Sequence, residues 1–177
     1  MPIMRKSSNC TIRCGASLIT VLILISILAG CGKSPNDMYA TGRTLLQTEE
    51  TREEGVKMLE KFVRKYPDDN RAPEVLLAIA MAGQGSGEYE KAGDAFNRLI
   101  ERYPETPEAY KGMFLLGYML YDEQKNNDRA RDVLNRFIAT YPDSSLTMSA
   151  KVLIENMDLP VEEWSTVKNL SGNPETP

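Results

Sequence analysis

Side chains that could carry out covalent or acid–base chemistry are scarce in this 177-residue sequence, which has three cysteines and no histidine. The absence of histidine excludes a Ser-His-Asp triad, a Cys-His pair and every metal site that needs an imidazole ligand. Three acidic pairs remain as candidates for general acid–base catalysis: Asp68-Asp69, Glu53-Glu54 and Glu162-Glu163. They fall in expected turns or first turns of helices, where solvated carboxylates are usual. We therefore expect no catalytic site and no bound metal.

A glycine-rich segment, Gly83-Gln84-Gly85-Ser86-Gly87, is similar to a phosphate-binding loop in composition. A helical pattern precedes it instead of a strand, and no Gly-Lys-Ser/Thr follows it. We interpret the segment as a turn between two helices.

Cys31 is a stronger candidate for chemistry, because of the residues that precede it. The first fourteen residues contain three basic residues and no acidic one, and residues 16–28 are almost wholly apolar. This run is shorter than the roughly 18 apolar residues of a spanning helix and follows the order of a signal peptide. It ends in Leu28-Ala29-Gly30-Cys31, which resembles the lipobox of bacterial lipoproteins. The resemblance implies cleavage of residues 1–30 and a covalent lipid on Cys31, with no other cofactor; the alternative is a core cysteine after an uncleaved anchor.

Cleavage at this point changes the charge of the chain and its means of attachment. The mature chain keeps 18 basic and 25 acidic residues, a net charge of −7, so its attachment to the membrane depends on acyl chains. Gly32 stands where an inner-membrane retention signal would have aspartate, which by the family rule favours the periplasmic face of the outer membrane. Residues 31–36 form the lipidated cysteine and its tether. Five extended residues span at most about 17 Å, so the folded body is expected close to the membrane.

Three helical segments of the remaining chain are copies of one another. Each ends in a Tyr-Pro pair, at Tyr66, Tyr103 and Tyr141, with separations of 37 and 38 residues. Four positions before each tyrosine hold residues of matching size: Gly55, Ala92 and Ala130; Leu59, Phe96 and Leu134; Phe62, Leu99 and Phe137; Val63, Ile100 and Ile138. Their spacing predicts an amphipathic helix, which proline ends because it lacks an amide hydrogen. The pattern is an internal repeat.

A second helix is expected before each of these segments. In the third copy, Thr106 suits the N-cap and Pro107 the first helical position. Residues 51–54, Thr-Arg-Glu-Glu, fit a capping box at the start of the first segment. A small residue recurs in the preceding helices, at Gly42, Ala80 and Gly117. We expect each to face the small residue of the following segment, at Gly55, Ala92 and Ala130, where two helices cross closely.

This arrangement of small and large residues resembles the tetratricopeptide repeat. The longer Tyr-Pro variant is similar to repeats of two bacterial envelope proteins, the tetratricopeptide lipoprotein of the β-barrel assembly machinery and the periplasmic repeat protein associated with the Tol-Pal system. The resemblance implies an all-α solenoid over residues 37–157. Its parts are three repeats, at about 37–67, 72–104 and 108–142, and a C-terminal capping helix at 145–157. Residues 158–177 are expected to be a poorly ordered tail, with Trp164 docked on the stack or free for a partner.

The resemblance also implies a concave face lined by the first helix of each repeat. The residues expected to point into it are Tyr39, Arg43 and Leu46; Leu77, Met81 and Gln84; Phe114, Tyr118 and Tyr121. An apolar, tyrosine-bearing groove suits an extended or helical segment of another protein. The alternative is that Leu77, Met81 and Phe114 only join neighbouring repeats.

Together these features predict a non-catalytic, lipid-anchored scaffold that binds another envelope protein in outer-membrane assembly or maintenance. No nucleic acid and no small-molecule substrate is expected as a partner. A helper in the Tol-Pal system, or in pilus or secretin assembly, is the alternative within the same class. A cell-wall enzyme is the remote alternative, and the missing histidine and the lack of a convergent carboxylate pair count against it.

The substitution Cys31→Ala should remove the covalent lipid and release the protein from membranes washed with salt, because the acidic body has no other expected attachment. Labelling with an alkyne fatty acid measures the first effect, and immunoblotting of membrane fractions measures the second. Cys14→Ala changes a thiol in the expected signal peptide and should leave both unchanged. A Cys31→Ala variant that stays in the washed membranes at the wild-type level would contradict the lipid anchor.

Overall fold

The computed structural model describes residues 33–160 and residue 163, and all the regular structure in these residues is helical. The helices are α2 (Pro35–Leu45), α3 (Glu49–Lys65), α4 (Ala72–Gly85), α5 (Tyr89–Arg102), α6 (Pro107–Asp122), α7 (Asn127–Thr140) and α8 (Thr147–Asn156). No helix in this part of the chain combines the length and the hydropathy needed to cross a membrane. The predicted signal peptide, the lipid site at Cys31 and Trp164 lie outside the described residues.

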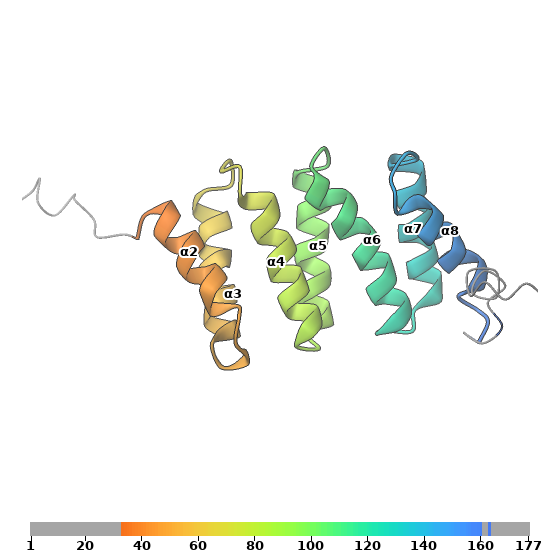
Figure 1. Ribbon diagram of the computed structural model, residues 1–177, viewed down its shortest axis with the longest axis horizontal. Coiled ribbons are helices and arrows are strands. Elements are labelled where there is room, and N and C mark those ends of the chain that lie inside the picture. Colours follow the sequence, from red (N-terminus) through yellow and green to blue (C-terminus); the bar gives the residue numbers. More distant parts are fainter. Residues whose placement is uncertain (1–32, 161–162, 164–177) are drawn as a thin grey trace, which may run out of the picture. The chain divides into compact units, whose positions relative to one another are not determined.

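From Pro35 onward the helices form three antiparallel hairpins, α2–α3, α4–α5 and α6–α7, followed by α8 (Figure 1). We call α2, α4 and α6 the A helices, and α3, α5 and α7 the B helices. Each B helix also packs against the first helix of the next hairpin, and α7 packs against α8. In Figure 1 the A helices and α8 lie on the near side with the B helices behind them. The predicted all-α solenoid of three repeats is confirmed.

The aligned apolar positions of the B helices form the centre of the core. Six side chains there have no exposed surface, two from each helix: Leu59 and Phe62, Phe96 and Leu99, Leu134 and Phe137. Full burial of a side chain of this size stabilises the fold by roughly 1.5–3 kcal/mol. The A helix α4 is buried on a wider arc, including Val75, Leu76 and Ile79, because it lies between two hairpins.

The Tyr-Pro pair at the end of each B helix makes the same turn three times. In the first turn, the amide of Tyr66 donates to the carbonyl of Phe62 at 2.8 Å, and the amide of Asp69 donates to the carbonyl of Tyr66 at 3.2 Å. The corresponding bonds that close the later turns run from Thr106 to Tyr103 and from Ser144 to Tyr141, at 3.0 and 3.1 Å. The turn bond uses the tyrosine carbonyl, so the carbonyl of the following proline remains open to another donor.

Tyrosine hydroxyls of the next repeat occupy that acceptor. The hydroxyl of Tyr103 donates to the carbonyl of Pro67 at 2.5 Å, and the hydroxyl of Tyr141 donates to the carbonyl of Pro104 at 2.8 Å. We call this pair of bonds the Tyr-Pro ladder. It ties the end of each B helix to the end of the B helix before it, so it sets the position of one repeat against the next.

The small residues permit close helix crossings, and the expected pair of Gly42 and Gly55 is confirmed, because a Cβ atom on Gly55 would lie 3.0 Å from the carbonyl oxygen of Gly42. A Cβ atom on Gly117 would lie 2.7 Å from Cγ and Cδ2 of Leu134, and one on Gly42 would lie 2.6 Å from Cδ2 of Leu59. Ala92 lies against Gly83, where an added Cβ would be 3.3 Å from that of Ala92. The atoms nearest to Gly117 are thus those of Leu134, and Ala92 contacts Gly83, while the expected pairs of Ala80 with Ala92 and of Gly117 with Ala130 stay predictions. The glycines of the A helices make room for a large B-helix side chain.

Helix starts near the N-terminal end of the stack also differ from the sequence prediction. The capping box at Thr51 is wrong, because α3 already begins at Glu49 after the N-cap Thr48. The Thr51 hydroxyl lies in the first turn and donates to the carbonyl of Leu45 at 2.7 Å, which joins α3 to the end of α2. The N-cap Thr106 is confirmed, since its hydroxyl accepts the amide of Ala109.

The last helix has charged residues at positions where the A helices pack against a B helix. It begins at Thr147, two residues after the expected Ser145, because the amide of Thr147 bonds the carbonyl of Ser144 as the turn closes. By repeat register, Lys151 takes the place of Leu76 and Met113, and Glu155 takes that of Ala80 and Gly117. Both are exposed. A further hairpin partner would bury these two charges, so α8 suits the end of a solenoid.

The substitution Gly117→Leu should lower the free energy of unfolding by roughly 1–3 kcal/mol, because the new side chain overpacks the crossing with the fully buried Leu134. Urea denaturation followed by circular dichroism measures the change. Gly93→Ala is the matched control in α5, where a Cβ would meet nothing closer than 3.9 Å. It should raise the stability by about 0.5–1 kcal/mol through helix propensity. Equal unfolding midpoints for Gly117→Leu and wild type would contradict the observed crossing.

Candidate binding face on the A helices

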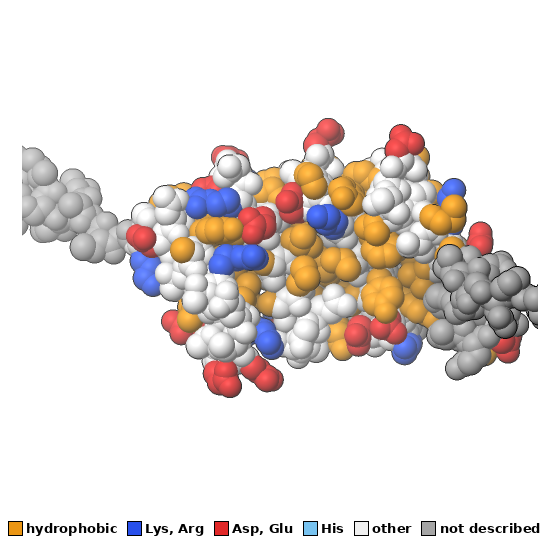
Figure 2. Space-filling model, viewed as in Figure 1, with side chains coloured by type: hydrophobic (Ala, Val, Ile, Leu, Met, Phe, Trp, Pro, Cys, Tyr) orange, Lys and Arg blue, Asp and Glu red, His pale blue; other side chains and the backbone are white. Residues whose placement is uncertain are grey.

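The residues predicted to line a groove come from three A helices: Tyr39 and Arg43 on α2 with Leu46 directly after it, Leu77, Met81 and Gln84 on α4, and Phe114, Tyr118 and Tyr121 on α6. The A-helix face is the one seen in Figure 2, where hydrophobic side chains gather over α4, α6 and α8 and charged groups gather toward α2. The two ends of the face therefore differ in chemistry.

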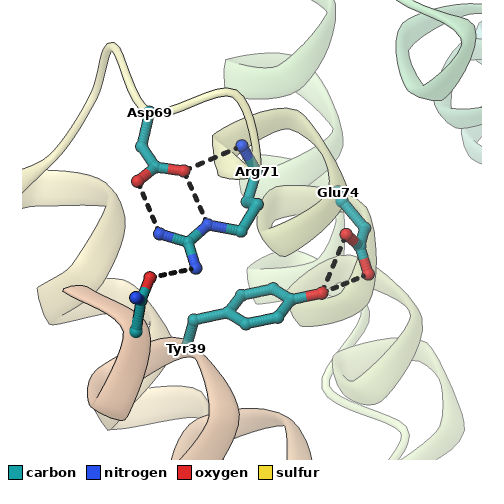
Figure 3. Close-up of polar contacts among 5 residues, drawn as sticks. Tyr39, Asp69, Arg71 and Glu74 are labelled. Atoms are coloured by element: carbon teal, nitrogen blue, oxygen red, sulfur yellow. Dashed lines mark hydrogen bonds and ion pairs between the residues drawn. The ribbon is translucent and has the colours of Figure 1, made fainter.

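At the α2 end, Tyr39 and Arg43 belong to an internal polar network, and Figure 3 shows the part of it that includes Tyr39 and Glu74. The Tyr39 hydroxyl donates to the carboxylate of Glu74 on α4, with 2.9 Å to each oxygen. Arg43 lies 3.5 Å from the same carboxylate. Burial, followed by the hydrogen bond to Glu74, raises the pKa of Tyr39. The structure brings these two predicted residues together at one carboxylate. Because Glu74 belongs to α4, both contacts join the first repeat to the second.

Arg71 completes the network from the turn before α4 (Figure 3). Its guanidinium donates to both oxygens of Asp69, at 2.8 and 2.7 Å, and to the side chain of Asn36 at 2.9 Å. It also lies over the ring of Tyr39, 4.9 Å from the centroid. The hydrogen bonds from Arg71 lower the pKa of Asp69 to about 2, so the carboxylate stays ionised at neutral pH. The network holds α2 against the turn and helix of the next repeat.

Sequence reasoning missed Asp69, Arg71 and Glu74. A usable signal was present, because Asp69 and Arg71 stand two residues apart in the turn after a Tyr-Pro stop. An aspartate in such a turn commonly bonds the backbone two residues on, and Asp69 does accept the amide of Arg71 at 3.0 Å.

The α4 and α6 part of the face is apolar and more open. Met81 is 54% exposed and Tyr118 is 39% exposed, which is unusual for large hydrophobic side chains on a packed helix. Leu77, Phe114 and Tyr121 are partly buried against the core. The ring of Phe114 lies edge-on to that of Phe137 at 5.9 Å, so this residue mainly joins α6 to its B helix. Among the predicted residues on α4 and α6, Met81 and Tyr118 are the exposed ones.

A shallow pocket of about 310 Å³ lies at the joint between the charged and the apolar ends. Three of its lining residues were predicted to face the groove: Arg43, Leu46 and Met81. The other four were not predicted: Arg52, Ala78, Ala82 and Gly85. Tyr118 and Tyr121 are outside this lining. The predicted residues thus form two neighbouring areas, on α2–α4 and on α6.

The last helix adds an exposed hydrophobic residue that sequence reasoning missed. Met148 on α8 is 69% exposed, the largest value among the exposed hydrophobic residues of the described chain. It was overlooked because α8 was expected to cover the last repeat with its apolar side. Within residues 33–160 and 163, no group of three or more histidine, cysteine or acidic side chains is arranged to hold a metal ion.

Comparison with known proteins gives one family match. The model of the family YfiO, described as outer membrane lipoprotein, matches residues 32–159. No curated protein sequence matches the chain. The matched residues include the three hairpins and α8.

Proposed function

The chain belongs to the YfiO family of outer membrane lipoproteins, and on this premise we propose that it is a non-catalytic scaffold that binds another envelope protein. The predicted resemblance to the tetratricopeptide lipoprotein of the β-barrel assembly machinery is confirmed by this family. The proposed task is assembly or maintenance of the outer membrane. The family match, which covers the whole described stack, supports this task over the Tol-Pal and pilus alternatives.

The proposed attachment is a lipid on Cys31, with the folded body on the periplasmic face of the membrane. The motif Leu28-Ala29-Gly30-Cys31 and the family description support it. The matched region begins at residue 32, directly after this cysteine. A short tether before α2 would keep the folded body near the membrane, where a partner in the same membrane is within reach.

The observation that carries the binding proposal is the exposure of Met81 and Tyr118 on successive A helices of one stack. Tyrosine and methionine are enriched in protein–protein interfaces and supply large contact areas. Their helices are held in place by packing on both sides, so a partner segment would not have to order the site on binding. An extended or helical segment laid across α4 and α6 would cover both side chains.

The proposal of a non-enzymatic role rests on residue chemistry. The sequence has no histidine to act as a base near neutral pH. On the A-helix face, Glu74 already accepts a hydrogen bond from Tyr39 and pairs with Arg43, so its charge is compensated. These groups stabilise the joint between repeats.

A photo-crosslinking amino acid at position 118 should capture a specific envelope protein in living cells, because Tyr118 lies in the proposed interface. Mass spectrometry of the adduct identifies the partner. Asn135 is the matched control, as an exposed residue on the B helix α7. Adducts of the same identity and yield at both positions, or no adduct at position 118, would contradict the binding face.

As a second readout, Met81→Asp should reduce the adduct at position 118, because a carboxylate in an apolar interface is desolvated without a partner. Met81 is half exposed, so the substitution should leave the thermal unfolding of the protein nearly unchanged. A loss of adduct that accompanies unfolding would not count for the interface, and circular dichroism separates the two cases.

A further inference from the structure

A second groove lies between the B helices α3 and α5 and is separate from the proposed binding face. It encloses about 620 Å³ and is bounded at its base by Val63 of α3 and Leu76 of α4. Its walls carry three arginines, Arg64 on α3 and Arg98 and Arg102 on α5. Three guanidinium groups in one groove are notable in a chain whose net charge is −4.

The three arginines differ in how far they are already paired. Arg98 is fixed by a two-pronged ion pair with Glu60, at 2.8 and 3.0 Å. Arg102 has only a distant pair, 3.9 Å from the almost fully exposed Asp68. For Arg64 the described residues supply no carboxylate within ion-pair distance. In this groove the guanidinium of Arg98 is therefore already paired, whereas those of Arg64 and Arg102 are available to bind an anionic group.

Two of the three arginines, Arg64 and Arg102, are specific to this joint between repeats. In the next joint, between α5 and α7, the position of Arg64 is taken by Glu101 and that of Arg102 by Thr140. A feature required only for packing the repeats would be expected at both joints. Arg64 and Arg102 are thus not a general property of the repeat, whereas the position of Arg98 is again an arginine, Arg136.

The mixed lining indicates which kind of anion fits. Glu60 and Glu101 stand among the arginines, so a dense negative charge such as a phosphate group would be repelled by Glu101. A polypeptide can place carboxylates opposite Arg64 and Arg102 and keep uncharged groups opposite the glutamate. Arginine binds carboxylates with two parallel hydrogen bonds, which favours such a pairing.

From this geometry we infer that the α3–α5 groove docks an acidic segment of a partner protein, at a site distinct from the A-helix face. The partner's carboxylates pair with Arg64 and Arg102, and the Glu60–Arg98 pair forms a fixed wall between the helices. Because the rest of the chain is acidic, such a segment is attracted to this groove and repelled elsewhere, which gives the contact its selectivity.

The test uses the full chain in detergent micelles and a fluorescein-labelled peptide, Gly-Asp-Asp-Leu-Glu-Glu-Gly, as the probe. Fluorescence anisotropy gives its Kd, and the amide version Gly-Asn-Asn-Leu-Gln-Gln-Gly measures binding without charge. The double variant Arg64→Glu, Arg102→Glu should raise the Kd by on the order of tenfold, since two exposed ion pairs are replaced by repulsions. Arg129→Glu, Arg136→Glu on α7 is the control with equal charge change and should bind as wild type does.

Four outcomes would overturn the inference. The first three are no binding of the acidic peptide, equal binding of the acidic and amide peptides, and an equal loss of binding in both double variants. A fourth is binding of phosphatidylglycerol vesicles or inorganic phosphate that depends on Arg64 and Arg102 while the peptide does not bind, because the groove would then be an anion site for the membrane. Adducts at position 118 are measured separately, so this test can fail while the A-helix face stands.

Discussion

The hydrogen bond from a tyrosine hydroxyl to the proline carbonyl of the preceding repeat is the interaction on which the stack depends. Tyr103 and Tyr141 each make it, at 2.5 and 2.8 Å. Proline has two effects here: it ends the B helix because it lacks an amide hydrogen, and its carbonyl is left outside the turn bond. The same two residues therefore stop one helix and fix the next repeat.

A stack held in this way presents its A helices in a regular row. The large B-helix side chains reach the A helices through Gly42 and Gly117, which have no Cβ to obstruct them. The network of Tyr39, Arg71 and Glu74 adds a polar tie between the first two repeats. Met81 and Tyr118 can remain exposed because core burial and the ladder, and not these two residues, supply the stability. The face is thus available for binding without loss of the fold.

Much of the fold was predictable from the sequence because the apolar positions repeat with the tyrosines. The pattern at Leu59, Phe96 and Leu134 gives the core directly, and all three are fully buried. The ladder was not predictable, since the pattern shows that tyrosine recurs but not where its hydroxyl points. The capping box at Thr51 was predicted because residues 51–54 fit its pattern. It is absent because the turn after α2 is short, so α3 already begins at Glu49. For the candidate site, helical register placed the residues on the correct helices. It could not show that Tyr39 and Arg43 share Glu74, because that contact crosses 35 residues of chain.

The most direct test of this account is the free energy of unfolding of Tyr103→Phe, measured by urea denaturation. The substitution removes the hydroxyl and keeps the ring, so only the bond to Pro67 is lost. We predict a decrease of about 0.5–1.5 kcal/mol. Tyr110→Phe is the control, since its ring packs near that of Tyr141 and no hydrogen bond of its hydroxyl is seen among the described residues. An unfolding free energy of Tyr103→Phe equal to that of wild type would contradict the claim that the Tyr-Pro ladder holds the repeats together.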